Sequence, residues 1–226
     1  MLYPYRKSTW AVIIFLLVIW PLFSVWVSSN GDLPAEVKNL SLEIYLPTLF
    51  VQFLLILMVL WALLRAKEGV NSVGLVGINW LNTLFGIGFL IFAVFFFSIL
   101  SQVIHGLDQP KEIAQYLPKT GLDYSLWIIL SLSAAIGEEL SFRGFLLTRL
   151  TPVLGNFWAA ALLSSISFGI GHLYQGALGV IFTGMYGFLF AILFYWRKSI
   201  YPCIVAHFLQ DALAPLIFSL AQTPAK

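Results

Sequence analysis

Hydrophobic residues along this chain come in long runs that are separated by short polar segments. A helix needs about 20 mostly apolar residues to cross a bilayer, and seven of the runs approach that length. We therefore predict an all-α, polytopic transmembrane bundle of about seven spans, with six or eight as the alternatives. The predicted spans cover residues 10–27, 44–64, 78–100, 124–145, 157–173, 177–195 and 200–220.

Composition agrees with a membrane protein. Hydrophobic residues make up 60% of the chain and charged residues 10%, whereas soluble domains carry about 25% charged residues. The net charge of +2 gives no reason to expect a nucleic-acid partner. Cys203 is the one cysteine of the sequence, which excludes a disulfide framework and a cysteine-based metal site.

Lysine and arginine residues near the span ends predict the orientation, because cytoplasmic loops carry an excess of them. In a seven-span arrangement one side receives more cationic residues than the other, and this bias favours a cytoplasmic N-terminus. We expect a multi-pass protein of a bacterial inner (plasma) membrane. The richer side has Arg6, Lys7, Arg65, Lys67, Arg149, Arg197 and Lys198, and the poorer side has Lys38, Lys111, Lys119 and Lys226.

Ionisable residues inside the spans concentrate in the second half of the chain. A charged side chain at the bilayer centre costs about 2.5–3.5 kcal/mol, so such residues indicate a functional site. We therefore interpret residues 1–123 as N-terminal scaffold helices and residues 124–226 as the helix bundle that carries the functional site, which the resemblance described below implies to be catalytic. The residues concerned are Glu138, Glu139, Arg143, His172, His207 and Asp211.

The segment IGEELSFRG, residues 137–145, places two adjacent glutamates and an arginine in an apolar run. Glu139 and Arg143 are four residues apart, so they share a helix face and can pair. Glu138 points about 100° away from Glu139 on an α-helix. Glu138 is therefore left to face another group, and it is the candidate general base.

The same four-residue spacing occurs twice more, in Phe168–His172 and in His207–Asp211. Each pair lies on one face of its predicted helix. Pro215 cannot donate the helical hydrogen bond to the Asp211 carbonyl, so the backbone is expected to be locally open there.

In this order, Glu138-Glu139-x-x-x-Arg143, Phe168-x-x-x-His172 and His207-x-x-x-Asp211 resemble the motifs of the CAAX prenyl protease and bacteriocin-processing family, also called the abortive-infection family. The resemblance covers about residues 124–215, and the local sequence EELSFRG is close to the family pattern. The resemblance implies an intramembrane endopeptidase that hydrolyses a peptide bond of a membrane-associated or prenylated, CAAX-type substrate.

The resemblance also implies a role for each motif residue. Glu138 and His172 would activate the attacking water, His207 and the residue at position 211 would stabilise the oxyanion, and the supporting residues would hold the site together. Those supporting residues are Glu139, Arg143 and Phe168.

Position 211 departs from the family pattern, where asparagine is common. An ionised Asp211 would repel an oxyanion, so it could instead be protonated, orient His207 or bind a metal. The sequence contains no HExxH motif, and we favour a metal-free, glutamate-type mechanism. The alternative is a catalytic zinc held by His172, His207 and either Glu138 or Asp211.

Two other classes of protein compete with a protease. A proton-coupled transporter would use the buried residues as a relay, and it would spread them across the bilayer instead of gathering them around one water. A non-proteolytic membrane scaffold or immunity protein would need no catalytic residues. The expected partner of a protease is a membrane-embedded or lipidated peptide; the sequence indicates neither its identity nor an oligomeric state.

Overall fold

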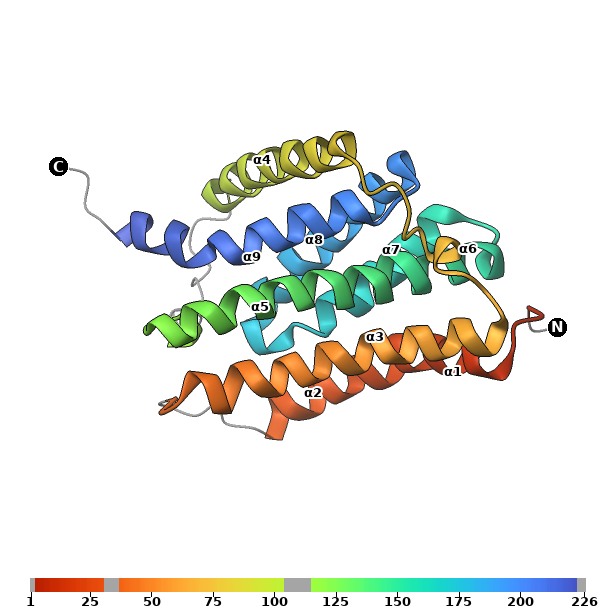
Figure 1. Cartoon of the computed structure of the whole chain (residues 1–226), viewed down its shortest axis with the longest axis horizontal. Coiled ribbons are helices and arrows are strands. Elements are labelled where there is room, and N and C mark those ends of the chain that lie inside the picture. Colours follow the sequence, from red (N-terminus) through yellow and green to blue (C-terminus); the bar gives the residue numbers. More distant parts are fainter. Residues whose placement is uncertain (1–2, 31–36, 104–114, 223–226) are drawn as a thin grey trace.

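The structure is a computed structural model that describes residues 3–30, 37–103 and 115–222, and every regular element in these residues is helical (Figure 1). Three segments, η1, η2 and η5, are π-helical, and η3 and η6 are short 3₁₀ turns. The order is α1 (Lys7–Ile14), η1 (Phe15–Ile19), α2 (Trp20–Asn30), η2 (Ser41–Tyr45), α3 (Leu46–Ala66), η3 (Val70–Val73), α4 (Trp80–Val103), α5 (Gly121–Glu138), η5 (Glu139–Leu147), α6 (Thr148–Leu154), α7 (Phe157–Ile170), η6 (Leu173–Gln175), α8 (Gly176–Arg197) and α9 (Tyr201–Gln222).

Within the described residues, six continuous helical stretches are long and apolar enough to cross a membrane, which confirms the all-α, multi-pass bundle. The fifth predicted span is the exception. Helix α7 has 14 residues and ends at Ile170, and at about 1.5 Å per residue it falls short of the bilayer thickness. The six stretches are Lys7–Asn30, Ser41–Ala66, Trp80–Gln102, Gly121–Leu154, Leu173–Arg197 and Tyr201–Ser219.

Local sequence signals fix where the two site-bearing helices α5 and α7 begin. The Thr120 hydroxyl accepts from the Asp123 backbone N–H, and the Asp123 carboxylate accepts from the Thr120 N–H, which forms a capping box. Asp123 also accepts from the Ser41 hydroxyl at 3.0 Å, which joins the start of α5 to η2. The Asn156 side chain caps the first N–H groups of α7.

Helix α5 lies in the middle of the bundle, between α3 and α9 (Figure 1). Helix α4 packs on α9, and α7 packs on α8. The π-helical segment η5, which continues α5, is buried along its whole length. Gly144 permits close approach there, because a Cβ at this position would lie 2.8 Å from the Val73 carbonyl oxygen of η3. The bundle therefore encloses the segment that carries Glu139 and Arg143.

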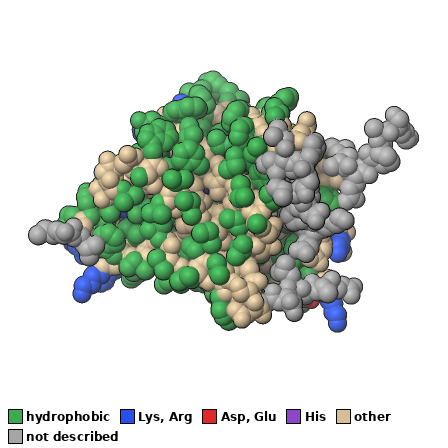
Figure 2. Space-filling model, turned by 180° about the vertical axis from the view of Figure 1, so that it is seen from behind, with side chains coloured by type: hydrophobic (Ala, Val, Ile, Leu, Met, Phe, Trp, Pro, Cys, Tyr) green, Lys and Arg blue, Asp and Glu red, His purple; other side chains and the backbone are tan. Residues whose placement is uncertain are grey.

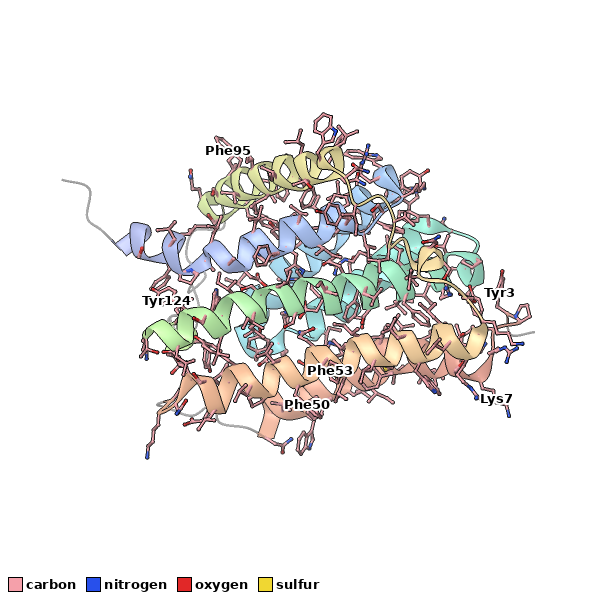
Figure 3. All side chains as sticks on the ribbon, viewed as in Figure 1. Tyr3, Lys7, Phe50, Phe53, Phe95 and Tyr124 are labelled. Atoms are coloured by element: carbon pink, nitrogen blue, oxygen red, sulfur yellow. The ribbon has the colours of Figure 1, made fainter. Side chains whose placement is uncertain are left out.

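The outer surface of the bundle is apolar, as expected for contact with lipid. Phe50 and Phe53 point outward from α3, and Phe95 points outward from α4 (Figure 3). More than half of each of these side chains is exposed. Figure 2 shows the opposite face, where hydrophobic side chains dominate and Lys and Arg lie near the rim.

The start of α1, the ends of α3 and α8, and α6 lie at one end of the bundle (Figure 1), and the cationic residues predicted for one side of the membrane lie in or next to these elements. Arg149 of α6 forms an ion pair with Glu68 and donates to Ser72 of η3, and its carbonyl accepts from the Tyr5 hydroxyl. These contacts bring the N-terminal segment, η3 and α6 together. Lys7 lies at this end and Tyr124 at the other (Figure 3). Lys111 and Lys226 lie outside the described residues. Which end faces the cytoplasm stays a prediction.

Candidate active site

Glu138 is the last residue of α5, immediately before the π-helical segment, and it is 8% exposed. Its Oε1 accepts a hydrogen bond from Gln52 Nε2 of α3 at 2.8 Å. Its Oε2 lies 3.9 Å from His172 Nε2 and 3.8 Å from His207 Nε2. One oxygen of this carboxylate is therefore held by an amide, and the other faces two imidazole rings.

Glu139 is fully buried, and its Oε1 lies 3.1 Å from Arg143 Nη1 and 2.9 Å from His207 Nδ1. The pair with Arg143 has the four-residue spacing that the sequence indicates, even though the backbone between them is π-helical. Glu139 therefore neutralises the arginine and also contacts α9. Such π-helical segments often occur at functional sites.

Arg143 is 2% exposed, and aromatic rings cover its guanidinium. The guanidinium carbon lies 4.2 Å from the centre of the Phe168 ring and 5.2 Å from that of Phe190. Both distances allow cation–π attraction. Gly187 leaves room for the group, because a Cβ there would lie 3.0 Å from Arg143 Nη2. Phe168 thus contributes its ring to the site, and its backbone carbonyl contacts His172.

His172 follows α7 and turns back along it, with Nδ1 2.8 Å from the Phe168 carbonyl oxygen. A carbonyl oxygen can only accept, so Nδ1 carries the proton and donates. The Nε2 of a neutral ring then presents its lone pair towards Glu138. The hydrogen bond to Phe168 holds the ring against the end of α7, with Nε2 3.9 Å from Glu138 Oε2.

His207 and Asp211 come from consecutive turns of α9. His207 Nε2 lies 3.4 Å from Asp211 Oδ2, so each ring nitrogen of His207 faces a carboxylate oxygen. Pro215 lies inside α9 and lacks an N–H for the Asp211 carbonyl. That carbonyl instead accepts from the indole Nε1 of Trp127 in α5, at 2.9 Å. The Asp211 carbonyl, which Pro215 leaves without a helical donor, thus joins α9 to α5.

The six ionisable residues predicted from the sequence therefore meet at one place, on three helical segments and the residue that follows α7. Two neutral residues that the sequence analysis did not single out, Gln52 and Trp127, join them. A polar amide in the apolar run FVQFLLIL was the available signal for Gln52.

The arrangement also bears on the zinc alternative. Among the described residues, no three histidine, cysteine or acidic side chains are placed to hold one metal ion. The donors nearest to such a set are His172, His207, Glu138 and Asp211, and Glu138 Oε2 lies 3.8–3.9 Å from the two imidazole Nε2 atoms. These residues do not form a ready zinc site, so we derive no step through a metal.

Residues 120–213 match the sequence model of a family described as type II CAAX prenyl endopeptidase Rce1-like. The match spans all six ionisable site residues and confirms the predicted family resemblance for this part of the chain. No curated protein and no solved structure gives a significant match. The family match supports a CAAX-type membrane endopeptidase in general terms, and it identifies neither the catalytic residues nor the substrate.

Proposed function

We propose that this chain is an intramembrane endopeptidase that hydrolyses a peptide bond of a membrane-associated or prenylated, CAAX-type substrate. The observation that carries the proposal is the position of Glu138 Oε2, which faces the Nε2 atoms of His172 and His207 inside an apolar bundle. A carboxylate that faces two imidazoles is suited to accept and return a proton.

The distance between Glu138 and His172 suits a water molecule hydrogen-bonded to both. Their facing atoms are 3.9 Å apart, too far for a direct hydrogen bond. A water oxygen about 2.8 Å from each atom can reach both at once. The Nδ1–H of His172 is already engaged by the Phe168 carbonyl, which leaves Nε2 as an acceptor for that water.

In the proposed reaction, the water oxygen attacks the scissile carbonyl carbon while Glu138 takes one proton from the water. His207 acts as an imidazolium in this proposal: its Nδ1–H donates to Glu139, and its Nε2–H, which lies beside Glu138 Oε2, can donate to the developing oxyanion. The carbon–nitrogen bond then breaks, and the proton on Glu138 passes to the leaving amine. The products are a new carboxylate and a free amine.

Four residues position the reacting groups in this proposal. Arg143 neutralises Glu139, which accepts from His207 Nδ1 and so orients the imidazole ring. Asp211 lies beside His207 Nε2 and is about one-third exposed. We assign Asp211 to the orientation of His207, because a carboxylate next to the oxyanion would oppose its charge. Phe168 covers the guanidinium and anchors His172.

The clustering of the six residues favours hydrolysis over the competing proton relay, which would spread its groups across the bilayer. The mostly apolar outer surface favours a substrate that approaches within the membrane, as a lipidated peptide would. We place the N-terminus in the cytoplasm of a bacterial cell, on the bias of lysine and arginine residues between the two ends.

The proposal is tested with purified protein in nanodiscs and a quenched peptide that carries a prenylated CAAX sequence. The same peptide without its prenyl group is the matched control, and mass spectrometry identifies the bond that is cleaved. We expect cleavage of the prenylated peptide, its loss in His172→Ala, and no effect of a chelator. Absence of cleavage contradicts the proposed substrate class, and loss on chelation that zinc restores contradicts the metal-free mechanism.

A further inference from the structure

Gln52 is a buried amide in the first half of α3, outside the segment that matches the family model. It is 3% exposed and lies in the apolar run of a membrane-spanning helix. A polar side chain at such a position is expected to have a specific partner, because the hydrocarbon interior offers no water to replace one. The partner of Gln52 is the carboxylate of Glu138.

The contact is direct, and the neighbouring backbone is shaped for it. Gln52 Nε2 donates to Glu138 Oε1 at 2.8 Å. The preceding residue of α5 is Gly137, where a Cβ would lie 2.6 Å from Gln52 Oε1 and 3.2 Å from the Gln52 carbonyl oxygen. Any larger residue at position 137 would therefore push α3 and α5 apart at the point where the hydrogen bond forms.

The orientation of the amide follows from its partner. A carboxylate oxygen only accepts, so the NH₂ group of Gln52 must face Glu138, and a flipped amide would bring two oxygens together. The Oε1 of Gln52 is buried and has no hydrogen-bond partner among the described residues. Within the part of the chain that the structure describes, the side chain therefore serves as a donor to Glu138 and makes no second hydrogen bond that would explain its position.

We propose that Gln52 is a positioning residue for Glu138, an inference that rests on the function proposed above. The terminal torsion of a glutamate side chain is broad, so a carboxylate held only at its stem can rotate. The hydrogen bond to Oε1 removes that freedom and directs Oε2 to the histidines. The site therefore depends on α3, and residues 120–213 lack the donor that orients their own general base.

The test compares Gln52→Met, which keeps the side-chain length and removes the donor, with Thr48→Val as a matched control. Thr48 lies one turn earlier on the same helix, and among the described residues its hydroxyl donates to the Ile44 carbonyl and not to a site residue. We expect Gln52→Met to lower kcat by ten- to a hundredfold with KM within about twofold, because the base is misdirected while binding is kept. Thr48→Val should change neither constant by more than about twofold.

Combining the variants separates this inference from the proposed function. In a Glu138→Gln background, Gln52→Met should cause no further loss of kcat, because the base is already absent. Activity that survives Glu138→Gln overturns the role of Glu138 as the base, whereas absence of cleavage by the wild-type protein overturns the proposed function. Loss in Glu138→Gln together with wild-type kcat in Gln52→Met overturns only the role of Gln52, as does an equal loss of kcat in Thr48→Val.

A second measurement does not depend on any substrate. Thermal unfolding of Gln52→Met, Glu138→Leu and the double variant gives the coupling between the two side chains. We expect the double variant to be less destabilised than the two single shifts predict, because the second change removes a partner that is already gone. Additive shifts would contradict a specific hydrogen bond and overturn the inference, even if no cleavable peptide is found.

Discussion

Glu139 Oε1 lies 2.9 Å from His207 Nδ1 and so connects the π-helical segment to α9. The same oxygen lies 3.1 Å from Arg143 Nη1. The four-residue spacing predicts a pair between Glu139 and Arg143 alone. In the structure, one carboxylate oxygen of Glu139 contacts both a guanidinium and an imidazole. Glu139 therefore sets the orientation of His207, and Glu138 is left for a different task.

Removal of the buried guanidinium should destabilise the protein strongly. Arg143→Gln leaves the buried Glu139 carboxylate with His207 as its remaining charged-group contact, and breaking a buried ion pair costs about 3–5 kcal/mol. Arg143→Lys should not restore stability, because a compact ammonium does not reproduce the contact of the planar guanidinium with the Phe168 ring. The exposed Arg65→Gln is the control. Thermal unfolding in detergent ranks the three variants by stability. An Arg143→Gln variant as stable as Arg65→Gln would contradict the account.

Two glycines of the bundle should respond oppositely to alanine. A Cβ on Gly169 would lie 2.6 Å from the Val180 carbonyl oxygen, so Gly169→Ala should separate α7 from α8 and cost about 1–3 kcal/mol. Gly88 lies beside an apolar groove between α4 and α8, and a Cβ there would meet nothing within 4 Å. Gly88→Ala should therefore stabilise its helix by up to about 1 kcal/mol. Unfolding midpoints of Gly169→Ala and Gly88→Ala that move in the same direction would contradict the close contact of α7 with α8 at Gly169.

The hydrogen bond from the Trp127 N–H to the Asp211 carbonyl should contribute measurably to the free energy of unfolding. Trp127→Phe keeps an aromatic ring and leaves that carbonyl without its donor, which should cost about 1–3 kcal/mol. The control is Trp26→Phe, because Trp26 is 60% exposed on the outer surface. Equal unfolding midpoints for the two variants would show that the Asp211 carbonyl, one turn before Pro215, needs no partner.

Asp211→Asn should be tolerated. An asparagine can still accept from His207 Nε2–H, and it removes a negative charge that lies beside the proposed oxyanion position. We expect kcat within about threefold of wild type or higher, and a loss of about tenfold or more for Asp211→Leu, which cannot orient the ring. Steady-state cleavage rates decide the matter. A large loss in Asp211→Asn would mean that the charge itself is needed.

Most of the charged site residues could be predicted from the sequence, because a charged side chain inside the membrane is costly and therefore indicates a functional role. Glu138, His172 and His207 stand out in apolar runs, and helical spacing places Arg143 beside Glu139. Gln52 was missed because a neutral amide is cheaper to bury and carries no charge to draw attention. Its partner is also 86 residues away in the chain, beyond the reach of a spacing argument.

The deviations from regular helices were beyond prediction for a different reason. A period of 100° per residue assumes α-helical geometry, whereas residues 139–147 form a π-helical segment, whose hydrogen-bond pattern leaves no simple sequence signal. The hydrophobic run at 157–173 predicts a span, but the helix ends at Ile170 and the chain turns at His172. That turn lets His172 reach the carboxylate of Glu138.

The most direct test of the central claim is kcat/KM of Glu138→Gln against the prenylated peptide. The matched control is Glu43→Gln, the same change at an exposed carboxylate near the start of α3. We predict a loss of about 10²–10⁴-fold in Glu138→Gln, the range of a general base, and wild-type activity in Glu43→Gln. A folded Glu138→Gln protein that retains wild-type kcat/KM would contradict the assignment of Glu138 as the base.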